Sequence, residues 1–116
     1  MATDEDAVVR CALDYFEGWF EADAERMRRA LYPDLAKRSL GGGGLDQLTA
    51  SEMVDATAAG SGRERDPAAR RIDVHVVEVY GDIATAVVDS NVYREYLHLV
   101  RTAEGWKIVN ALWAYS

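Results

Sequence analysis

"IDVHVVEVYGDIATAVVDSNVYREYLHLVRTAEGWKIVNALWAY", residues 72–115, decides the fold class of this chain. Four segments rich in β-branched and aromatic residues are separated by short turns, of which Gly81-Asp82 and Glu104-Gly105 are the clearest. Strands joined by such short connections usually pair as antiparallel neighbours. The stretch therefore predicts a four-stranded antiparallel meander at the end of the chain.

The first half of the chain has the periodicity of helices. Apolar residues recur at three- and four-residue steps from Val8 to Phe20, behind an N-cap and an acidic first turn at residues 3–6. A shorter helix, capped by Asp23, follows and is ended by Pro33. Residues 34–40 then predict a short strand.

A third helix is predicted from about residue 50 to residue 59. Thr49 and Glu52 have the capping-box spacing at its start, and Gly60 is a natural stop. Helices that come first and strands that come later predict an α+β fold rather than a parallel sheet. The length of 116 residues predicts one domain, residues 1–116.

Four consecutive glycines, Gly41 to Gly44, raise the question of a phosphate-binding loop. A P-loop needs a lysine and a hydroxyl after its glycines, and a dinucleotide loop needs Gly-x-Gly-x-x-Gly within a parallel βαβ unit. Here the glycines are followed by Leu-Asp-Gln-Leu. We interpret them as a flexible connection that lets the chain reverse between the short strand and the third helix.

Composition excludes several classes of function. Thirteen basic and twenty acidic residues give a net charge of −7, so a nucleic-acid partner is not expected. The acidic N-terminus and the lack of a long apolar run predict no signal peptide, no membrane partner and a cytoplasmic location. Cys11 falls on the apolar face of the first helix, where a buried, inert thiol is expected, and neither histidine has a partner at metal-ligand spacing. We expect no metal and no cofactor.

The last strand is partly apolar on both faces. Strict alternation divides its side chains into two sets: Trp106, Ile108, Asn110 and Leu112 on one face, and Val109, Ala111, Trp113 and Tyr115 on the other. Helices on one side of a sheet cover one such set, so the second either contacts another chain or coats an exposed rim with its terminal aromatic residues, and a large apolar patch favours the contact. We expect a homodimer through the outer sheet face, formed by Val109, Ala111 and Trp113.

Taken together, these elements resemble the nuclear transport factor 2-like superfamily. The resemblance covers nearly the whole chain and is carried by "YFEGWFEADAERMRRAL" at residues 15–31, "EYLHLV" at residues 95–100 and "GWKIVN" at residues 105–110. More narrowly, the chain looks like the SnoaL-like branch labelled putative lumazine-binding. This resemblance implies a cystatin-like cone, in which three N-terminal helices pack on a curved, mostly antiparallel sheet around a pocket. It also implies frequent homodimerisation, but no single chemistry, since members include isomerases, dehydratases, cyclases, hydrolases and non-catalytic domains.

The chain departs from the family pattern at two places. Tyr32-Pro33-Asp34 stands where the pattern has His-Pro-Asp, and Glu95 stands where an aspartate tends to precede Tyr-Leu-His-Leu. An acid–base role of that histidine in relatives does not transfer to Tyr32, because a tyrosine with a pKa of about 10 is a poor base at neutral pH.

Aromatic walls with a few polar groups suit a planar or cyclic small molecule. The ligand-binding residues that we expect are Tyr15, Trp19, Tyr32, Arg38, Tyr93, His98 and Asn110. The face of His98 is left open by the turn at residues 103–105. Two registers of that turn place His98 outward and Leu97 and Leu99 inward, and a third puts His98 in the pocket, on the same face as Asn110.

The leading hypothesis is a homodimeric small-molecule-binding domain with an aromatic-lined pocket. One alternative is an isomerase, dehydratase or cyclase that uses a buried acid such as Asp34, with Tyr15 or Tyr32 as hydrogen-bond donor. Another is a non-catalytic assembly domain whose outer sheet face binds a protein. A buried carboxyl with a raised pKa facing a cavity would favour the enzyme, and an apolar cavity without a titrating group would favour binding.

Overall fold

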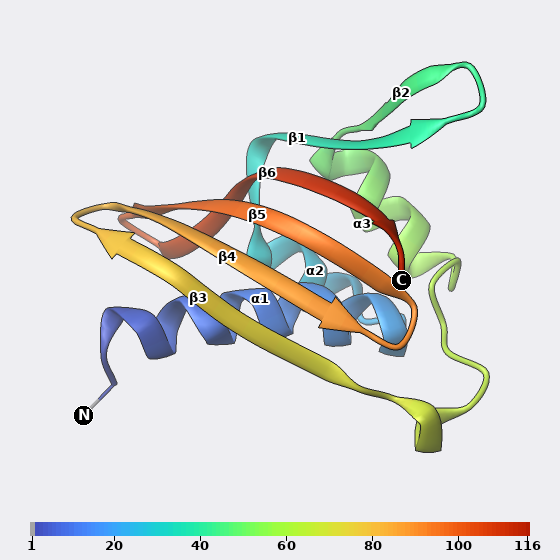
Figure 1. The fold of residues 1–116 in the computed structure, drawn as a ribbon, viewed down its shortest axis with the longest axis horizontal. Coiled ribbons are helices and arrows are strands. Elements are labelled where there is room, and N and C mark those ends of the chain that lie inside the picture. Colours follow the sequence, from blue (N-terminus) through green and yellow to red (C-terminus); the bar gives the residue numbers. More distant parts are fainter. Residues whose placement is uncertain (1) are drawn as a thin grey trace.

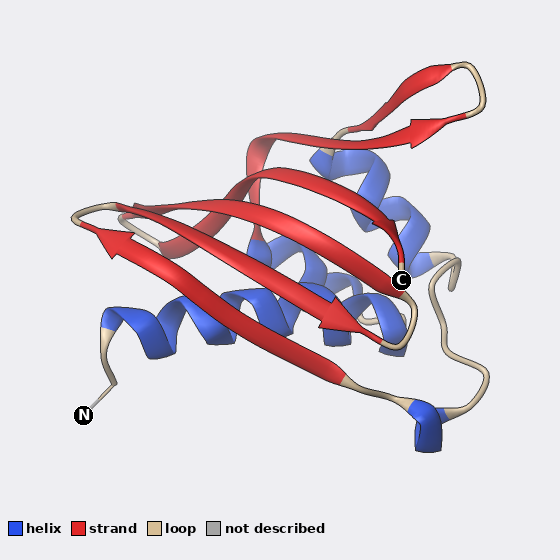
Figure 2. Cartoon of the chain, in the orientation of Figure 1, coloured by secondary structure: helices blue, strands red, loops and turns tan. Residues whose placement is uncertain are grey.

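The computed structural model describes residues 2–116 and has the α+β architecture that the sequence predicts. Three helices pack on one side of a six-stranded sheet (Figures 1 and 2). The helices are α1 (Asp4–Glu21), α2 (Ala24–Ala30) and α3 (Ala50–Ala58), with a short 3₁₀ helix η1 (Pro67–Ala69). The strands are β1 (Leu31–Gly41), β2 (Gly44–Leu48), β3 (Ile72–Tyr80), β4 (Ile83–Ser90), β5 (Tyr93–Thr102) and β6 (Gly105–Tyr115).

The sheet has the strand order β2-β1-β6-β5-β4-β3. The four C-terminal strands form the predicted meander, and β1 joins it as the parallel neighbour of β6. Helix α1 lies along the inner face of the sheet and contacts β3, β4 and β6 (Figure 1). The sheet is therefore mostly antiparallel, with one face covered by helices.

Local sequence signals set the starts of all three helices. The Thr3 and Thr49 hydroxyls accept a hydrogen bond from the backbone N–H three residues on, and the Asp6 and Glu52 carboxylates accept one from the backbone N–H of the cap residue, which completes two capping boxes. Asp23 caps α2 in the same way through the Arg26 N–H. Within residues 2–116, no helix combines the length and apolarity needed to cross a membrane.

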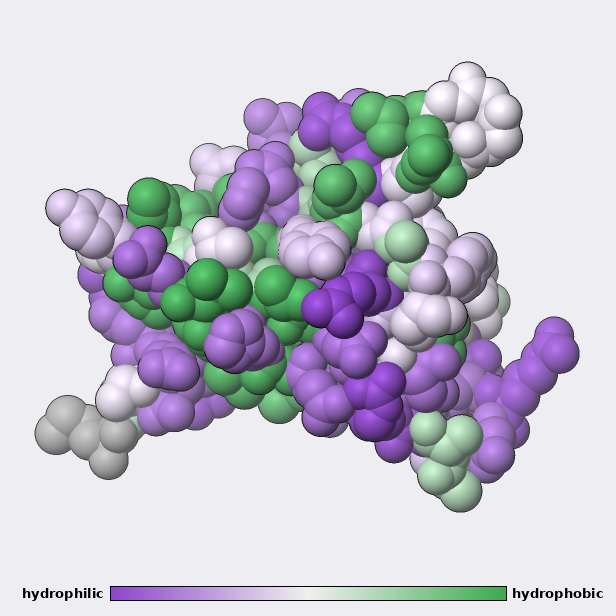
Figure 3. Space-filling view, viewed as in Figure 1, coloured by the Kyte–Doolittle hydropathy of each residue, from purple (hydrophilic) through white to green (hydrophobic). Residues whose placement is uncertain are grey.

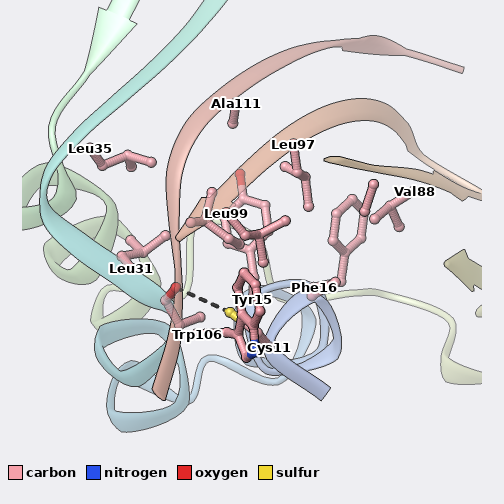
Figure 4. Packing of buried hydrophobic residues seen from close by; sticks show 14 of the residues in the cluster. Cys11, Tyr15, Phe16, Leu31, Leu35, Val88, Leu97, Leu99, Trp106 and Ala111 are labelled. Carbon is pink, nitrogen blue, oxygen red and sulfur yellow. Dashed lines mark hydrogen bonds between the residues drawn. The ribbon is translucent and has the colours of Figure 1, made fainter. Parts of the chain in front are cut away.

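The core lies between α1 and the middle strands. Tyr15 and Phe16 of α1 point toward the strands that carry Val88, Leu97 and Leu99 (Figure 4), and all five side chains are buried. Residues at three- and four-residue steps share one helix face, so the apolar residues of α1 form one side of this core and pack against the sheet.

Helix α2 is tied to α1 by an ion-pair cluster around Asp14. The Asp14 carboxylate is nearly buried and accepts hydrogen bonds from Arg26 at 3.0 Å and from Arg29 at 3.0 and 3.1 Å. Burial raises the pKa of Asp14, but the hydrogen bonds from Arg29 and Arg26 outweigh it and leave the pKa below its ordinary value. Asp14 therefore holds two helices together on the side of α1 that faces α2.

The segment after α2 differs from the prediction. Strand β1 begins directly at Leu31, so Tyr32 and Pro33 lie in the strand, and α2 ends before them at Ala30. The glycines form the turn of a hairpin, in which Gly41 pairs with Gly44, and Gly44 has a φ of 122° that favours glycine. The partner strand β2 was not expected, and the hairpin projects away from the body of the sheet (Figure 1).

Strand β6 contains an irregularity that corrects the expected faces. His98 pairs with Asn110 and Leu99 pairs with Ile108, so Val109 is an extra residue that interrupts the alternation. Ile108 and Ala111 are both buried as a result. The prediction that Ala111 and Trp113 lie on the outer face with Val109 is therefore wrong, because the bulge turns them toward the helices.

The outer sheet face is nevertheless apolar in part. Four large side chains on β3, β4, β5 and β6 are exposed there: Tyr80, Ile83, Tyr96 and Leu112. Apolar surface gathers over the middle of the sheet in Figure 3. The homodimer remains a prediction, and on this face it would use these side chains instead of Ala111 and Trp113.

Candidate functional site

A cavity of about 260 Å³ opens between the C-terminal half of α1, helix α3, the middle of β1, the start of β5 and the end of β6. Six aromatic side chains make up more than half of its lining, and two oppositely charged side chains complete one end. The lining residues are Tyr15, Phe16, Trp19, Lys37, Leu48, Met53, Ser61, Tyr93, Glu95, Trp113 and Tyr115.

Periodicity within each element aims these side chains at one space. Tyr15 and Trp19 are one helical turn apart on α1, and Tyr93 and Glu95 are two residues apart on β5. Trp113 lies beyond the bulge on β6, which turns it to the inner face. Without the extra residue at Val109, the period of two would place Trp113 on the outer face.

The polar end of the cavity is a chain of three buried side chains. The Tyr15 hydroxyl donates to Glu95 Oε1 at 2.8 Å, and Lys37 Nζ donates to the Tyr15 hydroxyl. Glu95 Oε2 lies 3.9 Å from Lys37 Nζ. Tyr15, Lys37 and Glu95 are only 2%, 7% and 3% exposed. We refer to these three residues as the polar triad.

Burial shifts the pKa of each member of the polar triad in the direction that favours the neutral side chain. It raises the pKa of Glu95, against the opposing effects of Lys37 and the Tyr15 hydrogen bond. It lowers the pKa of Lys37, which the charge of Glu95 only partly offsets. Burial and then the Glu95 charge raise the pKa of Tyr15, which stays a protonated donor. The cavity thus holds an acid and an amine whose pKa values are closer together than in water.

The cavity wall is an aromatic cluster around Tyr93. Trp19 Nε1 donates to the Tyr93 hydroxyl at 3.0 Å, which fixes the indole across the cavity. The Tyr93 ring stacks on Tyr115 at 5.7 Å and meets Trp113 edge-on at 5.4 Å between centroids. Such a wall offers flat apolar faces beside a hydrogen-bonded tyrosine hydroxyl, which suits a ring-shaped ligand.

A loop closes over Trp19 at the mouth of the cavity. A side chain added at Gly62 would come within about 2.1 Å of the Trp19 indole, so the loop backbone lies directly on the ring. Arg70 anchors the same loop to α1 through a 2.7 Å ion pair with Glu21, and a second ion pair, with Glu64, lies within the loop. Glycine at position 62 therefore lets the loop approach Trp19 and shape the cavity entrance.

The predicted ligand-binding residues divide into two groups. Tyr15, Trp19 and Tyr93 line the cavity, and their role in ligand binding stays a prediction. The other four lie elsewhere: Tyr32 in an open groove beside Asp34, Arg38 exposed on β1, and His98 and Asn110 on the outer face of β5 and β6.

His98 lies on the outer face of the sheet, as two of the three registers predicted, and Leu97 and Leu99 point inward. The third register, which placed His98 in the pocket with Asn110, is wrong. The bulge at Val109 brings Asn110 to the outer face as well, where its Nδ2 lies 3.4 Å from His98 Nδ1. Asp34 is exposed and is not the buried acid that the enzyme hypothesis needs.

Sequence reasoning missed Lys37, Glu95 and Trp113. A signal existed for the two charged residues, since Lys37 is two residues from Leu35 and Glu95 is two residues from Leu97, on the inward faces of their strands. Charged residues at such positions are normally assigned to solvent, and only a matching partner on another strand reverses that reading.

The described residues contain neither a cluster of metal ligands nor a reactive thiol. Within residues 2–116, no group of three or more His, Cys, Asp or Glu side chains could hold a metal ion. The Cys11 thiol is buried and donates to the Ala30 carbonyl (Figure 4), and burial raises its pKa to about 12. A thiol with that pKa is almost never a thiolate at neutral pH, so Cys11 acts as core packing.

The family described as "Putative lumazine-binding" matches residues 3–114, nearly the full chain. The chain belongs to this family. A search of curated proteins gives no match.

Solved structures confirm the fold. An NTF-2 like protein of unknown function from Silicibacter pomeroyi aligns with a TM-score of 0.79 at 15% identity, over 100% of both chains. An NTF2-like protein from Cytophaga hutchinsonii gives 0.80 at 15% identity, over 99% of this chain and 100% of its own. A ketosteroid isomerase-like protein from Erwinia carotovora atroseptica gives 0.72 at 14% identity, over 99% and 98%. At these identities the likeness establishes the nuclear transport factor 2-like fold and leaves the chemistry to the site.

Proposed function

We propose that this member of the putative lumazine-binding family binds a small ring-shaped molecule in the cavity. The observation that carries the proposal is the pairing of an aromatic wall with the polar triad at one end of a space of about 260 Å³. A planar ring packs against Trp19 and Trp113, and its polar substituent meets Lys37 or Glu95. An apolar molecule would form no hydrogen bond with the polar triad and would therefore bind less selectively.

The three tryptophans provide a built-in test with 2-naphthol, a flat bicyclic probe. In a ¹H–¹⁵N spectrum, the indole signals of Trp19 and Trp113 should shift on titration. Trp106 does not line the cavity, and its signal should stay in place. Equal shifts of all three indoles, or of none, would contradict binding in this cavity.

A matched pair of serine substitutions tests the location. Ser61→Phe places a ring at the cavity mouth and should weaken 2-naphthol binding by about tenfold or more, a loss of roughly 1.4 kcal/mol. Ser51→Phe makes the same change on the exposed surface of α3, outside this cavity, and should leave the affinity unchanged. Equal affinities for the two variants would place the binding site elsewhere.

A second candidate, proton transfer on the bound molecule, is favoured by Glu95. Its carboxyl is buried, faces the cavity and has a pKa raised by burial, which are the properties of a general acid or base that works near neutral pH. Exchange of the α-hydrogens of 2-tetralone in D₂O, followed by ¹H NMR, tests this function. Catalysed exchange should disappear in Glu95→Gln and persist in Glu25→Gln, a change on the exposed side of α2. Exchange that is no faster than in buffer would remove this candidate.

A further inference from the structure

The Lys37 amine is placed unusually for a surface-type residue. Its Nζ lies 4.9 Å from the Tyr15 ring centroid, 5.5 Å from Trp113 and 5.8 Å from Trp19. It lines the cavity while being 7% exposed, and its polar neighbours are the Tyr15 hydroxyl and the Glu95 carboxylate. A ligand that enters the cavity therefore meets a primary amine enclosed by three rings.

We propose that Lys37 condenses reversibly with the carbonyl carbon of an aldehyde or ketone carried by the ring that the cavity binds. This inference rests on the proposed binding function and names the chemical class of the ligand. Desolvated lysines are the amines that form Schiff bases with carbonyl compounds, because burial makes the unprotonated, nucleophilic form accessible. This condensation needs no metal and no redox reagent.

The polar triad supplies the proton transfers that this condensation requires. Lys37 donates to the Tyr15 oxygen, and Tyr15 donates to Glu95 Oε1, so a proton can pass from the ammonium through the hydroxyl to the carboxylate. This step gives a neutral amine and a protonated Glu95. Burial favours both products, since it lowers the pKa of Lys37 and raises that of Glu95.

The remaining steps balance in atoms and charge. The nitrogen lone pair forms a bond to the carbonyl carbon, the C=O π pair moves to oxygen, and a proton from nitrogen reaches that oxygen to give a carbinolamine. Glu95 then gives its proton to the carbinolamine hydroxyl, which leaves as water as the C=N bond forms. The products are an iminium cation on Lys37, a Glu95 carboxylate and one water.

The site that holds the ammonium is also suited to the iminium. The cation stays at the same nitrogen, among the three rings whose faces attract positive charge. The regenerated Glu95 carboxylate lies beside it, as it does beside the ammonium. The product therefore gains no unpaired buried charge, which would otherwise make condensation in a buried cavity costly.

The second lysine of the sequence serves as an internal control. The chain contains two lysines, Lys37 and Lys107. Lys107 Nζ donates to the Arg29 carbonyl at 2.6 Å at an exposed site and does not line this cavity. Both amines meet the same reagent in the same molecule, so their relative labelling does not depend on protein concentration or folding yield.

The experiment is reductive trapping with 2-naphthaldehyde and sodium cyanoborohydride near pH 7, read by peptide mapping. The reduced adduct should form on Lys37 at least about tenfold faster than on Lys107. Lys107→Met should label like wild type, Lys37→Met should lose the fast adduct, and Glu95→Gln should slow it. Adducts that form equally on both lysines, or first on Lys107, would overturn the inference. If Lys37→Met does not fold, the wild-type ratio still decides.

Binding of 2-naphthol, which has no carbonyl, separates the two proposals. Shifts of the Trp19 and Trp113 signals with no preferred label on Lys37 would overturn the condensation and leave the binding function standing. No such shifts and no preferred label would remove both.

Discussion

Replacing Lys37 with methionine should destabilise the protein by about 3–5 kcal/mol at pH 8, because it leaves Glu95 as a buried carboxylate without its cation. Methionine has a similar length and suits the aromatic surroundings, so the lost charge dominates the effect. Urea unfolding of wild type and variant measures the difference. Lys107→Met removes an exposed lysine and should change the free energy of unfolding by no more than about 1 kcal/mol.

The loss in Lys37→Met should depend on pH in a defined direction. Burial raises the pKa of Glu95 in the folded protein, and removing Lys37 also removes an influence that lowers it. The folded state therefore binds more protons than the unfolded state above the ordinary glutamate value of 4.5, and stability falls as the pH rises through that window. Below 4.5 the carboxyl is protonated in both states, so most of the loss should vanish. A variant as stable as wild type from pH 5 to pH 9 would contradict a buried charge pair.

The double variant Lys37→Met/Glu95→Gln should recover the loss and reach or exceed wild-type stability at pH 8. A glutamine carbonyl still accepts from the Tyr15 hydroxyl, and no charge remains in the cavity. Replacing a buried ion pair by neutral side chains of similar volume is often stabilising, by about 1–4 kcal/mol. In that case the charged pair lowers the free energy of unfolding, which points to a role of the polar triad in function and not in folding.

The same double variant separates stability from function. It should lose both the fast 2-naphthaldehyde adduct and the pH dependence of the single variant. Thermal unfolding at pH 5 and pH 8 checks the second point, since the double variant should show a smaller difference than Lys37→Met. A double variant that is less stable than Lys37→Met would show that the carboxylate stabilises the fold through contacts other than the pair.

The fold could be predicted from the sequence because its signals are local. The capping boxes at Thr3 and Thr49, the turn at Gly81 and the turn at Gly105 all act within a few residues, and each appears in the structure. Strand β2 escaped prediction because its pairing depends on a hairpin turn made entirely of glycine, and its residues are mostly exposed. A short edge strand with little burial leaves little hydrophobic pattern to read.

The candidate site was only half predicted, for two physical reasons. The aromatic wall follows from helix and strand periodicity, so Tyr15, Trp19 and Tyr93 could be named. The bulge at Val109 depends on pairing between β5 and β6, and strict alternation put Trp113 on the wrong face.

Lys37 and Glu95 illustrate the second reason. They are buried because they meet each other across two strands that are far apart in the sequence. A single strand shows only an isolated charge on an apolar face, which is normally read as solvent-exposed. The departure at Glu95 from the family pattern marked the right position, but its partner on β1 gave no such mark.

The four consecutive glycines form a hairpin turn and not a phosphate-binding loop. Gly41 to Gly44 turn the β1–β2 hairpin, and none of them lines the cavity. The glycine that shapes the cavity is Gly62, which allows the loop backbone to lie on Trp19. Position 62 needs glycine because a larger residue would collide with the indole. Its backbone does not require glycine, since a positive φ is found at Gly60 and not at Gly62.

A crystal structure of the protein grown with 2-naphthol tests directly whether the cavity beside the polar triad binds a ring-shaped molecule. Electron density for the bicyclic ring is expected between Trp19 and Trp113, with its hydroxyl within hydrogen-bond distance of Lys37 or Glu95. Density for the probe only on the outer sheet face near His98 and Asn110, or a cavity filled by repacked side chains, would contradict binding at this site.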